Sequence, residues 1–390
     1  MATEDARYRQ SSQYQLWSFS PTQLATMREQ TNTAARTRIA ERLSSLPSLS
    51  NNLSAPTSSA NTPDPDGAST PALPEFLSPP EEAQLVTFYT SELMRAGDHA
   101  EMSDEIKATA AAFFRRFYVT NSIMTYPPTE MLIVALFFAC KAEGTFVSIS
   151  ELVSLVSLSV EGSTLLTFTS RFAKTFGRDN PEHIIAGEFL LCQGLRFALD
   201  VKHPFRALRG AIMELTTLGD IEARPSPDSL ARTRTNTHPS LQDSRLAAAE
   251  HRAREILRFS PLITDAYFHY TPSQIMLAAL SLADRGLAER LITHTFHYVA
   301  PPPNNSGADT PAATSNLESA PLPKRLPIRT LNPAAAVEDK SQIIGSHLRD
   351  RVLGTIEACR DLLARELPER REHWTNVTLS LFFRFLPTTH

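Results

Sequence analysis

The chain reads Thr-Asn-Ser-Ile-Met-Thr-Tyr-Pro-Pro over residues 120–128 and Thr-Asp-Ala-Tyr-Phe-His-Tyr-Thr-Pro over residues 264–272. A constant offset relates the two stretches, since 270 − 126 = 144. In both, a proline occupies the first turn of the expected helix, and an acid or amide follows it (Glu130 or Gln274). The register continues into these helices, where Met131, Leu132, Ala135, Leu136 and Ala139 correspond to Ile275, Met276, Ala279, Leu280 and Ala283. The sequence therefore contains an internal repeat.

The helix that follows each copy is apolar on every side. Residues 131–140 read Met-Leu-Ile-Val-Ala-Leu-Phe-Phe-Ala-Cys, and residues 275–280 read Ile-Met-Leu-Ala-Ala-Leu. A helix without a polar face must be surrounded by other helices. Alternating β-branched patterns are nearly absent, so a sheet is not expected. We therefore predict an all-α chain with two tandem helical bundles, each wrapped around one central helix.

Length and composition agree with two folded units joined by polar segments. The chain has 390 residues, of which 42% are hydrophobic, and this is more than one small core requires. Its prolines cluster in Ser/Thr-rich stretches without a helical period, which are typical of flexible segments. The expected division is an N-terminal helix at 1–43, a flexible linker at 44–80, a first bundle at 81–200, a second bundle at 201–299 with a flexible insertion at about 221–243, a flexible insertion at 300–335, C-terminal helices at 336–373 and a tail at 374–390.

Several functional classes find no support in the sequence. The three cysteines form no CxxC pair, and the eleven histidines are scattered, so no metal site is expected. Glycine-rich phosphate loops and the GxSxG and HExxH motifs are missing, so neither a cofactor nor a catalytic residue is proposed. With a net charge of −4, the chain lacks the basic excess typical of nucleic-acid-binding proteins, so direct nucleic-acid binding is not expected. The longest apolar run is too short to span a bilayer, and no signal peptide is evident, so we expect a soluble intracellular protein.

The amino-terminal segment carries a clear helix start. Ser20-Pro21-Thr22-Gln23 places serine at the N-cap, proline at the first helical position and glutamine at the third. Aromatic side chains before this start need a surface on which to pack. The candidate docking residues are Tyr14, Trp17, Phe19 and Leu24. The simplest interpretation is that these side chains cap their own domain.

Two helical bundles with buried central helices resemble the tandem boxes of a cyclin. The first is similar to the cyclin pattern over residues 113–118 (Phe-Phe-Arg-Arg-Phe-Tyr) and 139–143 (Ala-Cys-Lys-Ala-Glu). The basic Arg115 is similar to transcription-type cyclins, whereas most cell-cycle cyclins have aspartate there. Residues 262–267 and 270–275 resemble the cyclin H family more narrowly. The resemblance covers most of residues 7–43, 81–299 and 336–373.

This resemblance implies which residues bind a partner. Cyclins place one lysine and one glutamate against backbone groups of the kinase's mobile C-helix, and Lys141 and Glu188 match these positions. The apolar positions of the same groove are matched by Phe138, Cys192, Phe197 and Leu199. From the residues alone, Lys141 is a cation favoured at a helix C-terminus, Glu188 is an exposed helical acid, and the other four belong to the core. Gly144 departs from the family, which usually has a second acid there.

The resemblance also implies a function. We expect a non-catalytic regulatory subunit that binds and activates the cyclin-dependent kinase of the kinase-activating complex. The implied partners are that kinase, a RING-finger assembly factor and core transcription factor IIH. The implied setting is the nucleus, with roles in RNA polymerase II transcription, the cell cycle and DNA repair. The terminal helices, including one near Ser341 to Leu367, are expected to pack together beside the boxes.

Three alternatives stay open. A cyclin C-type protein shares the basic residue at Arg115 and an N-terminal aromatic segment. A factor IIB-type protein also uses two cyclin folds, but it binds promoter DNA and carries a zinc ribbon and a basic core, for which this net-negative chain gives no sign. A helical scaffold without a kinase is the third alternative.

Overall fold

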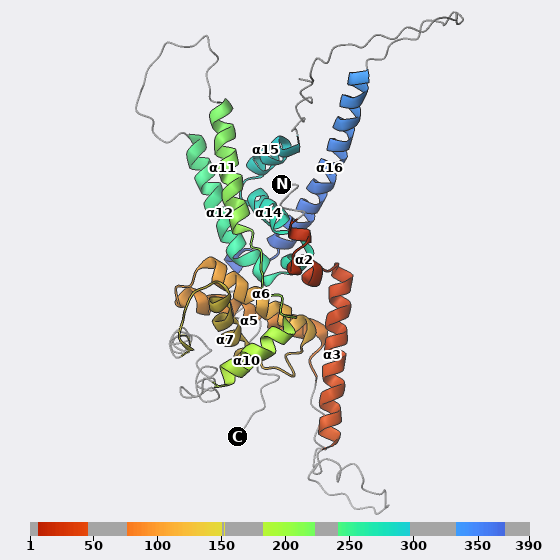
Figure 1. The fold of residues 1–390 in the computed structure, drawn as a ribbon, viewed down its shortest axis with the longest axis vertical. Coiled ribbons are helices and arrows are strands. Elements are labelled where there is room, and N and C mark those ends of the chain that lie inside the picture. Colours follow the sequence, from red (N-terminus) through yellow and green to blue (C-terminus); the bar gives the residue numbers. More distant parts are fainter. Residues whose placement is uncertain are drawn as a thin grey trace, which may run out of the picture.

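The computed structural model describes residues 7–45, 76–149, 152, 182–222, 241–296 and 333–370, and these contain helices and no strand. Figure 1 shows two bundles stacked along the long axis. The elements in chain order are α2 (Ser12–Trp17), α3 (Pro21–Ser44), α5 (Pro79–His99), α6 (Asp104–Thr120), α7 (Pro128–Ala142), α10 (Glu182–Gly194), α11 (Phe205–Glu222), α12 (Leu241–Ile263), α13 (Ala266–His269), α14 (Pro272–Ala283), α15 (Arg285–Phe296), α16 (Pro333–Ala364) and the 3-10 helix η2 (Pro368–Arg370). The prediction of an all-α fold with two bundles is confirmed.

The two apolar helices lie at the centres of the two bundles. In the first bundle, α7 contacts α5, α6 and α10, and in the second, α14 contacts α11, α12, α15 and α16. Nearly every side chain of residues 131–140 is buried, as are all those of residues 275–280. The second copy begins with a capping box between Thr271 and Gln274, and the first begins with Pro127 and Pro128. The repeat therefore marks the buried centre of each bundle, as predicted.

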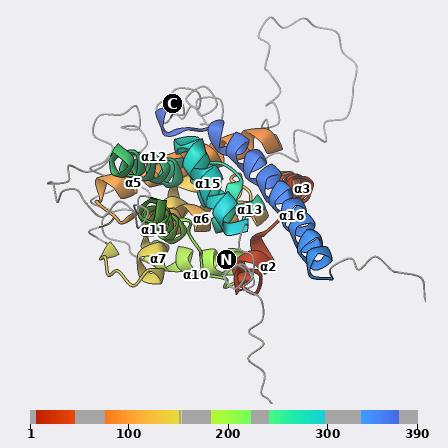
Figure 2. The same ribbon diagram turned by 90° about the horizontal axis from the view of Figure 1, so that it is seen from above.

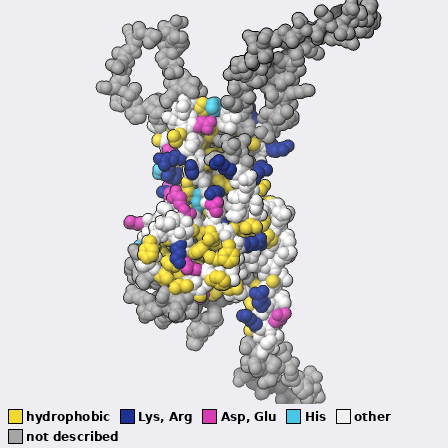
Figure 3. All heavy atoms as spheres, viewed as in Figure 1, with side chains coloured by type: hydrophobic (Ala, Val, Ile, Leu, Met, Phe, Trp, Pro, Cys, Tyr) yellow, Lys and Arg dark blue, Asp and Glu magenta, His cyan; other side chains and the backbone are white. Residues whose placement is uncertain are grey.

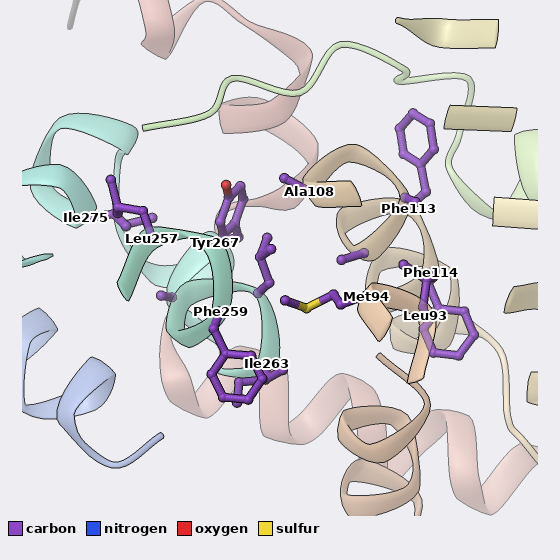
Figure 4. Close-up of a cluster of buried hydrophobic side chains, with 14 of the residues drawn as sticks. Leu93, Met94, Ala108, Phe113, Phe114, Leu257, Phe259, Ile263, Tyr267 and Ile275 are labelled. Carbon is purple, nitrogen blue, oxygen red and sulfur yellow. The ribbon is translucent and has the colours of Figure 1, made fainter. Parts of the chain in front are cut away.

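One hydrophobic core runs through both bundles. Figure 4 shows Met94 and Ala108 of the first bundle on the side that faces Tyr267 and Ile263 of the second. Contacts between α12 and the helices α5 and α6 carry the core across the junction. Because burial of apolar surface is the main stabilising contribution, the bundles support one another.

The amino-terminal helix α3 begins as predicted. Ser20 accepts a hydrogen bond from the backbone N–H of Gln23 at 3.2 Å, and the Gln23 side chain accepts one from the Ser20 N–H at 2.9 Å. Further along, α3 docks on α5 and α6 through polar groups. Asn32 donates to Glu82 at 3.0 Å, and Thr31 donates to the carbonyl oxygen of Val119 at 2.9 Å. The helix therefore lies against the first bundle.

The carboxy-terminal helix α16 packs on the second bundle, where it contacts α12, α13, α14 and α15. Seen from above, it runs alongside α15 (Figure 2). The expectation that the terminal helices form a pair is wrong among the described residues, because each finds its larger contacts on a different bundle. The expected linker, insertions and tail fall largely on residues 46–75, 223–240, 297–332 and 371–390, which lie outside the described residues.

Candidate functional site

The site begins where α7 ends. The N–H of Gly144 bonds to the carbonyl of Lys141 at 3.1 Å, and that of Thr145 bonds to the carbonyl of Cys140 at 2.8 Å. This helix-terminating arrangement requires a left-handed residue, and Gly144 has φ of +72°. The departure from the family at Gly144 thus has a backbone reason. It places Lys141 in the last helical turn, where a cation is favoured by the helix dipole.

Two glycines allow α10 to pack closely on the first bundle. A Cβ atom on Gly187 would lie 2.6 Å from Cγ2 of Val134 in α7, and one on Gly194 would lie 2.5 Å from the Phe117 ring in α6. Such distances are too short for any side chain, so only glycine permits this approach. Neither glycine was predicted from the sequence to have a role. The available signal was their seven-residue spacing within one helix, where glycine is otherwise unfavourable.

Lys141 and Glu188 meet across α7 and α10. Nζ of Lys141 lies 2.7 Å from Oε1 of Glu188 and 2.9 Å from Oε2. It also lies 4.5 Å from the centre of the Phe137 ring, at a distance typical of a cation–π contact. The Lys141 side chain is 51% exposed and that of Glu188 is 14% exposed, so the pair opens toward solvent on the lysine side.

Exposed apolar side chains lie on α10 and just beyond the ends of α7 and α10. Ile185, Phe189 and Phe197 are 54%, 62% and 66% exposed, and Phe146, beyond the end of α7, is 93% exposed. Ile185, Glu188 and Phe189 share one face of α10 by helical spacing. Figure 3 shows hydrophobic side chains gathered over the region of α7 and α10. We call Lys141, Glu188, Ile185, Phe189 and Phe197 the α7–α10 face. Exposed apolar patches of this kind mark protein-binding surfaces.

The remaining predicted groove residues are less accessible. Phe138 is partly buried, with its ring 5.7 Å from that of Phe113, and Leu199 is partly buried against the core. Cys192 is partly exposed. Burial raises the pKa of its thiol, the charge of Glu188 raises it further, and the charge of Lys141 opposes both. Cys192 therefore lies beside the charge pair, whereas Phe138 and Leu199 also have a core role.

The amino-terminal aromatic segment docks at the junction between the bundles. Trp17 is fully buried and Leu24 is 2% exposed, in a cluster with Val119 and Ala198 of the first bundle and Phe268 of the second. Phe19 packs against this cluster, and its N–H donates to the carbonyl oxygen of Phe268 at 2.8 Å. Tyr14 lies apart, with its ring 5.6 Å from that of Tyr8. The docking surface is therefore shared by both bundles.

Asp265 joins three parts of the chain. Arg115 of α6 donates to its Oδ1 at 2.7 Å and to the carbonyl oxygen of Ile263 at 2.9 Å. Arg28 of α3 also pairs with Asp265. Burial by itself raises the pKa of Asp265, but the hydrogen bond from Arg28 and the charge of Arg115 outweigh it and hold that pKa well below its usual range. The basic residue noted in the sequence thus ties the first bundle to the second.

A hydrogen-bond chain links the end of α7 to the second bundle. The hydroxyl of Thr109 donates to Glu143 at 2.6 Å, and Nε2 of His203 lies 2.8 Å from that same hydroxyl. Nδ1 of His203 lies 2.9 Å from the hydroxyl of Tyr267. Because the single proton of Thr109 is used on Glu143, His203 must donate from Nε2 and accept from Tyr267 at Nδ1. Burial, with the nearby charge of Arg116, lowers the pKa of His203 to about 3, in agreement with a neutral ring.

Among the described residues, no group of three or more His, Cys, Asp or Glu side chains is arranged to hold a metal ion. None of the described helices has the length and apolar character needed to cross a membrane. Within the described part of the chain, the α7–α10 face is thus the candidate supported by both charge and exposed apolar surface.

Comparisons with known proteins place the chain in a family. A family model described as the cyclin C-terminal domain matches residues 203–364. A chain in the structure of the CAK complex from Chaetomium thermophilum bound to ATP-gamma-S is 56% identical, with a TM-score of 0.64, and the match covers 98% of this chain and 86% of that one. Cyclin CCL1 of Saccharomyces cerevisiae is 28% identical over 296 residues, which are 75% of this chain and 62% of that protein.

A further relative, the putative cyclin-H of Dictyostelium discoideum, is 24% identical over 278 residues, which are 70% of this chain and 75% of that protein. The match to Cyclin CCL1 spans less than two thirds of that relative's length. The identity to the Chaetomium thermophilum chain, over most of both lengths, is high enough to establish common family membership. The chain therefore belongs to the cyclin family, within the group that includes cyclin H.

Proposed function

We propose that the chain binds and activates the cyclin-dependent kinase of a kinase-activating complex, as a non-catalytic regulatory subunit. The observation that carries this proposal is the Lys141–Glu188 pair, which opens to solvent among exposed apolar side chains of α10. Relationship to a chain of the Chaetomium thermophilum CAK complex supports the choice of kinase. The wider setting follows from the same resemblance: a RING-finger assembly factor and core transcription factor IIH as partners, polymerase C-terminal repeats and other cyclin-dependent kinases as substrates, and a nuclear location.

The charge pair has hydrogen-bonding capacity left for a partner. An ammonium group has three donors and a carboxylate has about four acceptor positions, so one internal pairing leaves several of each. A helix presented to this face offers backbone carbonyl oxygens to Lys141 and N–H groups to Glu188. The exposed rings of Phe189 and Phe197 supply apolar area beside these polar contacts. Interfaces are commonly built this way, with aromatic anchors near a few desolvated charges.

Activation follows from selective binding. A protein kinase requires its strand lysine to pair with the C-helix glutamate before phosphoryl transfer can occur. A rigid surface that binds only the swung-in position of the C-helix shifts the equilibrium toward it by the difference in affinity between the two positions. The close packing of α10 on α7 through Gly187 supplies such rigidity. The cyclin contributes no reacting group.

The test reverses the charge pair in the full chain. Lys141→Glu with Glu188→Lys preserves the internal attraction and presents the wrong charges to the partner. We expect affinity for the kinase subunit of the Chaetomium thermophilum CAK complex to fall at least about tenfold, with thermal melting unchanged. Reversing the exposed Arg285–Glu289 pair, at 2.8 Å, is the matched control. Unchanged affinity in the Lys141/Glu188 variant would contradict the proposed site.

A further inference from the structure

We propose that Trp17 is a positioning residue for the kinase-binding surface, because it holds the turn at residues 195–199 that presents Phe197 to solvent. The inference rests on the proposed function and deepens it. It connects the amino-terminal segment to the α7–α10 face through one identifiable contact.

The turn has an unfavourable backbone. Arg196 and Phe197 have φ of 53° and 56°, so two consecutive residues with side chains occupy the left-handed region. Each residue with a Cβ atom in this region carries a conformational cost. Backbone hydrogen bonds close the turn, from Phe197 to the carbonyl of Cys192 and from Ala198 to that of Leu195, both at 3.0 Å. Phe197 itself is 66% exposed, so burial of its own ring does not offset this cost.

Trp17 contacts the turn on both flanks of Phe197. Its ring centre lies 5.6 Å from the guanidinium carbon of Arg196. On the other flank, Ala198 is 5% exposed and belongs to the same buried cluster as Trp17. The ring centre also lies 5.5 Å from the guanidinium carbon of Arg116, which donates to the carbonyl oxygen of Ala198 at 3.4 Å. The indole therefore packs against the residues on both sides of Phe197, and Arg116 links it further to the backbone of Ala198.

The contact of Trp17 is one of packing and charge. The indole Nε1 is buried without a hydrogen-bond partner among the described residues, so stacking and cation–π attraction carry the contact. A neighbouring contact secures the segment after the turn, because Gln13 accepts a hydrogen bond from the backbone N–H of Lys202 at 2.6 Å. Residues 13–17 therefore hold the chain on both sides of Leu199.

A double-mutant cycle separates positioning from general stability. The variants are Trp17→Ala, Trp17→Phe, Phe197→Ala and the Trp17→Ala/Phe197→Ala double variant, all in the full chain. The affinity of each for the Chaetomium thermophilum kinase subunit is measured. We expect Trp17→Ala and Phe197→Ala each to weaken binding about tenfold. Once Phe197 is absent, Trp17→Ala should weaken binding less than about twofold, and Trp17→Phe should restore most of the affinity.

Arg196→Ala tests the same contact from the exposed side, where folding is not at risk. It should weaken binding in the wild-type background and have no further effect beside Phe197→Ala. Amide exchange should accelerate at Phe197 and Ala198 in Trp17→Ala and remain unchanged over residues 131–140. Additive losses in the cycle would overturn the proposal, as would full affinity in either Trp17→Ala or Arg196→Ala. The Lys141/Glu188 reversal distinguishes this failure from that of the proposed function, because it weakens binding whether or not Trp17 acts through Phe197.

Discussion

Arg28 and Asp265 form a two-point pair between the amino-terminal helix and the second bundle, with Nη2 to Oδ1 at 2.7 Å and Nη1 to Oδ2 at 2.9 Å. Since α3 makes most of its contacts with the first bundle, this pair spans the junction. Arg115 contacts the same carboxylate and is only 7% exposed. One carboxylate therefore pairs with two cations from different helices, and its removal would leave a buried guanidinium with fewer partners.

Replacing Asp265 by asparagine should destabilise the junction. We expect a loss of about 2 kcal/mol, because Arg115 stays buried while its charge partner is gone. The depressed pKa of Asp265 means that its contribution is present above the ordinary carboxyl pKa of about 4 and is lost as the pH falls toward the folded value. Urea unfolding at pH 7 and pH 3 measures both effects. Between pH 7 and pH 3, the free energy of unfolding should fall less in the variant than in the wild type. Glu289→Gln, in an exposed pair, should cost less than about 0.5 kcal/mol.

His203 should make the protein less stable in mild acid. Its pKa is about 3 in the folded state and about 6.5 in the unfolded chain. Below pH 6.5 the unfolded state therefore takes up a proton that the folded state rejects, and stability falls by about 1 kcal/mol per pH unit. His203→Gln should flatten the dependence of the urea midpoint on pH between 7.5 and 5.5. His294→Gln is the control, since that ring pairs with Glu214 at an exposed position. Parallel pH profiles for wild type and His203→Gln would contradict this account.

Gly187→Ala should move α10 away from α7. The added methyl group meets Cγ2 of Val134 at 2.6 Å, and overpacking of this kind costs about 1–3 kcal/mol. Glu188 moves with the helix, so kinase binding should weaken as well. Gly210→Ala is the matched control, because nothing lies within 4 Å of that added atom in α11. Adding Val134→Ala makes room and should restore the affinity that Gly187→Ala removes. If Gly187→Ala and Gly210→Ala have the same melting temperature and the same affinity for the kinase, close packing is not what positions Glu188.

Hydrogen exchange should show α3 opening before the central helices. Only Leu24, Asn32 and Ala35 are buried along its 24 residues, whereas α7 buries most of its length. Regions with few buried contacts open at lower free energy than the core. The amides of residues 24–40 should therefore exchange faster than those of residues 131–140 under native conditions. Equal protection would mean that the polar contacts of Asn32 and Thr31 hold α3 as firmly as the core is held.

Local signals predicted much of this fold. The repeat located α7 and α14 because an all-apolar helix has few structural solutions, and Ser20 gave the start of α3 because capping depends on neighbouring residues. The site was harder to predict. Lys141 and Glu188 were named through resemblance, and the residue types alone favoured a solvated cation and acid. Their pairing is a new observation, and their role in kinase binding stays a prediction.

Contacts distant in sequence explain what was missed. Nothing local in Arg115 or Asp265 indicates that they meet across 150 positions. From the residues alone Phe197 had a core role, as aromatic residues usually have, and only the structure shows that its side chain is 66% exposed. The pairing of the terminal helices was expected from the resemblance to the cyclin H family, whereas α3 and α16 make their larger contacts with different bundles. Nothing local in the sequence indicated that α3 docks through Asn32, Thr31 and Arg28.

The 144-residue offset has a consequence for stoichiometry. Since 141 + 144 = 285, the offset aligns Arg285 with Lys141 in sequence, although Lys141 lies in the last turn of α7 and Arg285 begins α15. It lies 3.7 Å from Glu357 of α16, so the second bundle carries a cation–acid pair of its own. Yet none of the described side chains of α14, α15 and α16 is a large exposed apolar group. If charge alone selected the partner, each chain would offer two equivalent docking positions. Among the described side chains, exposed aromatic groups accompany the Lys141–Glu188 pair and not the Arg285–Glu357 pair, so we expect one kinase-docking face on this part of the chain.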